Sequence, residues 1–241
     1  MPYTMINLNI ILPILVLGLA SLILFIVTCV LCLRKEKYLQ KKSTIFNTFP
    51  CELNSLLTEK RRVYAVYSFF LFLLFYVGGS LIYTFNLLTT LGEFNWLGLV
   101  IVIVIFVESI MYGLNFGFSL FYPNKHIIFT TLSFASTILK NGLLATYGFY
   151  NSHVMRDYSQ FSISFGTAIA YSVLALLLVI LLLNPKLSSW AKKNKTEQDG
   201  ATYFLRPKVN FLALTEWIYI ASLGITLILL IVDTSLGYMF L

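Results

Sequence analysis

The stretch Trp96–Tyr122, WLGLVIVIVIFVESIMYGLNFGFSLFY, indicates the fold class of this chain. As an α-helix rising about 1.5 Å per residue, it is long enough to cross a bilayer core of about 30 Å. A glutamate, Glu108, lies near its middle. Because a carboxylate is costly in lipid, this glutamate must face protein or enclosed water. The stretch therefore predicts a transmembrane helix packed inside a bundle.

The same helix carries a polar stripe and a pair of small residues. Gly113 and Gly117 form a small-xxx-small pair, which is typical of helices that allow a neighbour to approach closely. The stripe repeats at helical spacing and therefore occupies one face. Its members are Glu108, Tyr112, Asn115 and Ser119.

Composition supports a membrane protein along the whole chain. Of 241 residues, 59% are apolar and only 11% are charged, and the mean hydropathy is +0.84. A soluble domain carries about 25% charged residues. The net charge is +7, but the charges lie almost entirely between apolar blocks. Such basic loops indicate orientation or contact with anionic lipid headgroups, and they do not favour nucleic acid as a partner.

Six apolar segments predict an all-α polytopic membrane protein, with the whole chain, 1–241, as one integral membrane domain. Short connections between most segments favour an up-and-down bundle. The connections are loop 1 (34–62), loop 2 (92–95), loop 3 (123–126), loop 4 (151–160) and loop 5 (184–210). The expected helices span about 8–33, 63–91, 96–122, 127–150, 161–183 and 211–232.

Charge asymmetry predicts an orientation for this bundle. Loops 1, 3 and 5 carry eight, one and six basic residues, whereas loop 2 carries none and loop 4 one. The positive-inside rule therefore places loops 1, 3 and 5 in the cytoplasm and both termini outside. Anionic lipid headgroups become expected partners of loops 1 and 5.

Residues with metal or catalytic chemistry are few. Cys29 and Cys32 lie on one face of the first span and are expected to pack there, while Cys51 stands alone in loop 1. With two histidines in total, bis-histidine haem and most zinc sites are effectively excluded. Without a motif that pairs a nucleophile with a base, we expect no enzyme, no metal and no cofactor, although remodelling of a lipid is left open.

Two polar groupings are candidate sites. Glu108 and Lys140 fall at similar depth on neighbouring spans, so they could form either a structural ion pair or a coupling site for a proton or ion. Tyr112, Asn115 and Asn141 add intramembrane polar groups nearby.

The second grouping lies at the membrane interface, on the side of loops 1 and 5. His126, Glu216 and Glu59 lie near helix ends there, and Trp217 is a typical interfacial anchor. The group could bind a lipid headgroup or an ion. Equally, its members could be separate interfacial residues that water satisfies.

Several of these residues also occur at spacings that resemble the Frag/DRAM/Sfk family of six-helix membrane proteins. Glu216-Trp217 opens the last span after a basic loop, and His126 precedes the fourth span. The other residues that carry the resemblance are Phe49-Pro50, Glu59, Asn95, Asn115-Phe116, Phe134 and Asp233.

The resemblance implies a eukaryotic protein of the endomembrane system or plasma membrane, with His126, Glu216 and Trp217 as a structural or lipid-facing cluster. Relatives are linked to autophagy and lysosomes, to lipid remodelling of glycosylphosphatidylinositol anchors, and to phosphoinositide kinase recruitment and phospholipid organisation. Two features depart from the family. Cys51-Glu52-Leu53 stands where relatives usually carry a serine-aspartate pair. The family also places loops 1 and 5 in the lumen or outside, opposite to the orientation that the charges predict.

These observations favour a non-enzymatic membrane protein that acts in lipid organisation, trafficking or autophagy. A first alternative is a small transporter or channel subunit that uses Glu108 and Lys140. A second alternative is an accessory subunit of a larger membrane complex, with protein partners docked on the loops.

Overall fold

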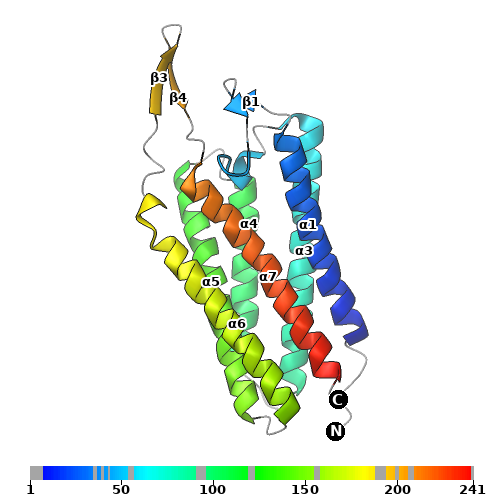
Figure 1. Ribbon diagram of the computed structural model, residues 1–241. Coiled ribbons are helices and arrows are strands. Elements are labelled where there is room, and N and C mark those ends of the chain that lie inside the picture. The colour runs from blue at the N-terminus through cyan, green and yellow to red at the C-terminus, as the bar shows by residue number, and fades with distance from the viewer. Residues whose placement is uncertain are drawn as a thin grey trace.

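Over the residues that it describes, the computed structural model is a bundle of six long helices (Figure 1). Each helix contains a stretch long and apolar enough to cross a membrane, so the chain is an all-α polytopic membrane protein, as the sequence predicted. The helices are α1 (Leu8–Leu33), α3 (Glu59–Thr90), α4 (Trp96–Phe118), α5 (Pro123–Val154), α6 (Tyr158–Leu182) and α7 (Phe211–Met239). The structure describes residues 8–34, 37–38, 41–42, 44–53, 57–90, 96–118, 123–154, 158–187, 194–198, 201–205 and 209–239.

Consecutive helices pack against one another, and α7 closes the ring. α1 packs on α3, α3 on α4, α4 on α5, and α5 on α6. α7 then returns to lie between α6 and α1, and it also contacts α3 and α5 (Figure 1). Because α7 touches four other helices, polar groups along it can bond to several neighbours.

Short extramembrane elements gather at one end of the bundle. Loop 1 contains the hairpin of β1 (Lys37–Tyr38) and β2 (Lys41–Lys42), and loop 5 contains that of β3 (Asn194–Gln198) and β4 (Ala201–Leu205). Figure 1 shows both hairpins beyond the start of α7, whereas α1 begins and α7 ends at the opposite end. Loops 1 and 5 therefore share one side.

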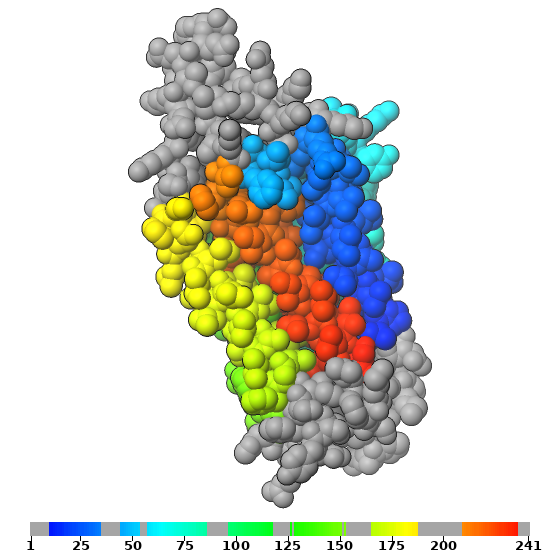
Figure 2. All heavy atoms as spheres, in the orientation of Figure 1, coloured from blue at the N-terminus to red at the C-terminus, as the bar shows by residue number. Residues whose placement is uncertain are grey.

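Residues 44–53 of loop 1 fold onto the bundle, and we name them the loop-1 cap. The cap includes the 3-10 helix η2 (Pro50–Glu52), which packs against α4 and α7. Thr48, Cys51 and Leu53 are buried, so this semi-apolar stretch packs on protein. Figure 2 shows the cap seated between the end of α1 and the start of α7.

Several helices extend beyond their predicted ends. Residues 123–126, expected to form loop 3, are the first turn of α5, because Pro123 suits the first helical position, where its missing N–H is not needed. Asp233, expected in a tail beyond the last helix, lies inside α7. The predicted third span continued to Tyr122, and its residues 119–122, with Ser119, lie outside the described residues.

The predicted close approach at Gly113 and Gly117 is wrong. Among the residues that the structure describes, the nearest neighbour of a Cβ atom at Gly113 would lie 4.0 Å away, and a Cβ atom at Gly117 would meet nothing within 4 Å. Leucine side chains of α1 instead fill the space beside Gly79 of α3 and Gly224 of α7. A Cβ atom there would lie 2.8 Å and 2.6 Å from them. The tight helix contacts therefore involve α1.

Candidate functional site

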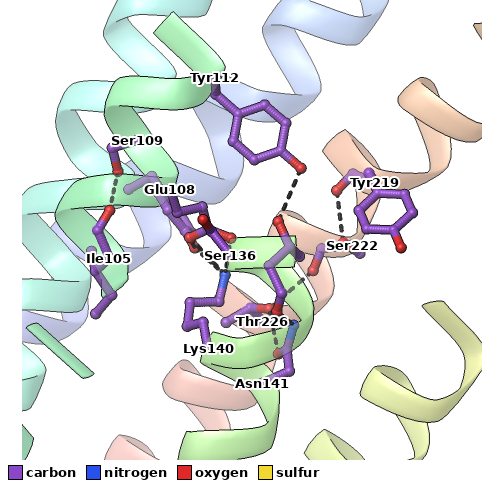
Figure 3. Close-up of polar contacts among 12 residues, drawn as sticks. Ile105, Glu108, Ser109, Tyr112, Ser136, Lys140, Asn141, Tyr219, Ser222 and Thr226 are labelled. Atoms are coloured by element: carbon purple, nitrogen blue, oxygen red, sulfur yellow. Dashed lines mark hydrogen bonds and ion pairs between the residues drawn. The ribbon is translucent and has the colours of Figure 1, made fainter. Parts of the chain in front are cut away.

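Glu108 of α4 and Lys140 of α5 form an ion pair inside the bundle. The Lys140 Nζ lies 2.8 Å from Oε1 and 3.0 Å from Oε2 of Glu108. The Lys140 side chain is 1% exposed and the Glu108 side chain is 0% exposed. Figure 3 shows them pointing toward one another from adjacent helices. The structure thus joins the two charges whose pairing the sequence left open.

A third helix completes the pair through Tyr76 of α3. Its hydroxyl donates a hydrogen bond of 2.6 Å to Oε2 of Glu108, and Lys140 also donates to the Tyr76 hydroxyl. The carboxylate therefore receives bonds from two side chains, as a buried charge requires. We name Glu108, Lys140 and Tyr76 the central triad. Tyr76 was not a sequence candidate.

A separate set of hydrogen bonds near the central triad joins α4, α5 and α7 (Figure 3). The Tyr112 hydroxyl lies 3.1 Å from the Thr137 Oγ1, joining α4 to α5. Asn141 donates to the Thr137 carbonyl at 2.8 Å and accepts from the Thr226 hydroxyl of α7 at 3.1 Å. The intramembrane polar residues predicted from sequence therefore bond helices to one another.

His126 is the centre of a second cluster near the loop-1 cap. Its Nε2 lies 3.0 Å from Oε1 of Glu216, and its Nδ1 lies 2.8 Å from Oδ1 of Asn115. Thr130 donates to the same Asn115 oxygen at 3.2 Å, which agrees with an Asn115 side chain whose oxygen, rather than its nitrogen, faces His126 and Thr130. Because both ring nitrogens face oxygen acceptors, the doubly protonated imidazolium satisfies the site best.

The charges around His126 favour this protonated form. Burial lowers the pKa of His126, but the hydrogen bond and the negative charge of Glu216 raise it more, and the charge of Glu52 adds to the increase. The net result is a pKa above the ordinary value of 6.5. Glu216 is 2% exposed, and its Oε2 has no hydrogen-bond partner within the described part of the chain.

Trp217 fastens the loop-1 cap to the helices. Its indole Nε1 donates to the Thr48 carbonyl at 2.9 Å. The backbone N–H of Asn210, just before α7, donates to the Phe46 carbonyl at 2.8 Å. The Phe49 ring meets the His126 ring edge-on, with centroids 5.5 Å apart. The cap, α5 and α7 therefore form one unit, which we name the cap latch: Thr48, Phe49, Asn115, His126, Glu216 and Trp217.

Glu59 does not join this cluster, although the sequence grouped it there. It is exposed in the first turn of α3, and no contact recorded for the described residues links it to His126 or Glu216. Glu52 acts in its place, because the cap folds back over the bundle end and brings its charge near His126. In the sequence, the Phe49-Pro50 pair just before Glu52 was the feature that could have pointed to this segment.

A third carboxylate occupies the opposite end of α7. Asp233 accepts hydrogen bonds from the Tyr83 hydroxyl and, at 3.2 Å, from the Thr167 hydroxyl. These bonds connect α7 to α3 and α6. Among the residues that the structure describes, no group of three or more histidine, cysteine or acidic side chains is placed to hold a metal ion.

The central triad predicts a large difference between single and double charge removal. Glu108→Gln or Lys140→Met alone leaves an unpaired buried charge, which costs about 3–5 kcal/mol. The double variant removes both charges, and we expect it to regain most of the loss. Thermal unfolding of the purified protein in detergent measures this, with Glu59→Gln as an exposed control. Single variants as stable as the parent would contradict the prediction.

The cap latch predicts stability that depends on pH. Because the pKa of His126 is higher in the folded chain than its ordinary value, the stabilisation is fully present below about pH 6.5 and is lost as the pH rises through the folded pKa. We expect the melting temperature to fall as the pH rises above about 6.5, and His126→Gln to reduce that slope. The matched control is His153→Gln, at the other histidine. Equal slopes in both variants would refute this role for His126.

Comparison of the chain with protein-family models, with curated proteins and with solved structures finds no match.

Proposed function

We propose that this chain is a non-enzymatic multi-pass membrane protein, similar to members of the Frag/DRAM/Sfk family, that organises membrane lipids in the endomembrane system or plasma membrane. The observation that carries this proposal is a convergence in space. Four elements of the resemblance, distant in sequence, meet in the cap latch: Phe49-Pro50, Asn115-Phe116, His126 and Glu216-Trp217.

The convergence matters because each of these residues is a weak signal alone. Phe116 stacks on Phe69 with centroids 4.3 Å apart and lies edge-on to Phe25 at 6.0 Å. Phe25 in turn stacks on Trp217 at 5.9 Å. The polar part of the cap latch thus lies beside an aromatic cluster. Phe134 and Asp233, also part of the resemblance, lie elsewhere: Phe134 stacks on Tyr219, and Asp233 bonds to α3 and α6.

The chemistry of the cap latch suits a structural or lipid-facing role. His126, Glu216 and Asn115 bond to one another, and Trp217 bonds to the cap backbone. A side chain used in this way holds shape, whereas a general base needs a reacting group within reach. The latch fixes the cap near the membrane interface, where lipid headgroups lie.

The proposal predicts that opening the cap latch changes lipid distribution. His126→Ala and Glu216→Ala remove the two partners of one contact, so we expect each variant to alter the distribution of fluorescent reporters for anionic lipids, and the double variant to add little. The milder His126→Gln serves where alanine lowers the protein level, and Glu59→Ala is the exposed control. An unchanged lipid distribution at normal protein level would remove this assignment.

The resemblance also predicts the side of loop 5. Asn194-Lys195-Thr196 is a glycosylation acceptor sequence at the start of β3, where Asn194 pairs with Leu205 of β4. If loop 5 lies in the lumen, expression in a eukaryotic cell gives a glycosidase-sensitive mass shift that Asn194→Gln abolishes. A cytoplasmic protease or tag result for loop 5 would instead favour the charge-based orientation and count against the family.

A second candidate is a proton- or ion-coupled transporter or channel subunit. Its support is the series of buried polar groups that lines the inner faces of α5 and α7 and includes Lys140 of the central triad. In such a protein, Glu108→Gln abolishes flux while the chain still reaches the membrane. The buried members of the series are Thr130, Ser133, Thr137, Lys140 and Asn141 on α5, and Glu216, Ser222 and Thr226 on α7.

A further inference from the structure

A groove on the outside of the bundle, between α1 and α3, lies apart from the cap latch and the central triad. Its volume is about 570 Å³, within the range of roughly 300–1,000 Å³ that small-molecule sites have. Its walls include Leu24, Thr28 and Leu31 of α1, and Tyr64, Tyr67 and Leu71 of α3.

The groove opens toward the lipid. Tyr67, Tyr64 and Leu31 on its walls are 71%, 66% and 54% exposed, although they belong to membrane-spanning helices. A side chain in this position contacts acyl chains in a bilayer, because the ring of helices turns it away from the interior. The occupant of the groove therefore reaches it from the membrane.

Basic residues stand at one end of the groove. On α3, Lys60 precedes Tyr64, Tyr67 and Leu71 at i, i+4, i+7 and i+11, so the four share one helical face. On α1, Arg34 follows Leu31 by about one turn. Both Lys60 and Arg34 are exposed.

The antiparallel packing of α1 and α3 brings these charges together at the same end. α1 finishes at Leu33, α3 begins at Glu59, and both ends lie on the loop-1 side of the bundle (Figure 1). At that level, long basic side chains extend toward the headgroups while their stems remain against apolar surface. A hydrocarbon groove thus meets a cationic edge at headgroup depth.

We propose that this groove binds one phospholipid with an anionic headgroup. One acyl chain lies along the leucine and tyrosine walls, and the headgroup meets Lys60 and Arg34. Charge complementarity selects this occupant, because an uncharged lipid or an apolar helix gains nothing from the two cations. The site deepens the proposed lipid role, on which its biological meaning rests.

The test uses the purified full-length chain and native mass spectrometry. The probes are phosphatidylserine and phosphatidylcholine with identical acyl chains, mixed in equal amounts. We expect phosphatidylserine to be retained preferentially. Replacing both cations, Arg34→Gln with Lys60→Gln, should weaken phosphatidylserine binding roughly 30-fold. Lys186→Gln, which removes an exposed charge beyond the end of α6, is the matched control and should leave binding unchanged.

Filling the groove tests the acyl-chain part of the site. Thr28→Trp from α1 and, independently, Leu71→Trp from α3 should each reduce retention of phosphatidylserine in variants that remain monodisperse. Equal retention of both lipids would overturn the proposal, as would equal weakening by Lys186→Gln. If the cap-latch variants leave lipid distribution unchanged but phosphatidylserine still binds preferentially, the groove proposal is supported and the proposed function is rejected. If the cap-latch variants change lipid distribution but phosphatidylserine is not retained preferentially, only the groove proposal is rejected.

Discussion

The buried ion pair between Glu108 and Lys140 is the constraint on which the arrangement of the bundle depends. Each charge alone is costly in a membrane interior, so the two must lie at one depth and face each other. Tyr76 extends this requirement to α3 through its bond to the same carboxylate. Three of the six helices thereby acquire a fixed rotation and a fixed vertical register, which apolar packing in lipid would specify weakly.

Helix α7 carries that order to the rest of the molecule. Near its start, Glu216 and Trp217 hold α5 and the loop-1 cap, and farther along Thr226 joins Asn141. Toward its end, Asp233 binds side chains from α3 and α6. Each polar residue serves a different neighbour. This explains how α7, which follows α6 in the sequence, also packs on α1 and closes the ring.

Hydrophobic length predicted the six spans because crossing the bilayer imposes a minimum number of apolar residues, which is readable locally. Glu108 and Lys140 were identifiable for the same reason, since a charge inside such a run is conspicuous. Their contact was not predictable, because helix rotation depends on neighbours. Nothing in the sequence indicated the role of Tyr76, and the spacing of Gly113 and Gly117 predicted a close helix contact that does not form. Glu52, and not Glu59, lies near His126, because the fold of the cap depends on tertiary contacts that sequence spacing does not reveal.

Loop 1 connects the two features at the basic end of the bundle. Its two flanks, the end of α1 and the start of α3, carry Arg34 and Lys60 beside the groove, while its middle forms the cap held by His126 and Trp217. A lipid held at the flanks and a proton held by His126 would therefore act on the same short segment. Side chains of α5 and α7 hold the cap, and the two ends of loop 1 join α1 and α3. The covalent chain of loop 1 thus links the basic end of the groove with the cap latch.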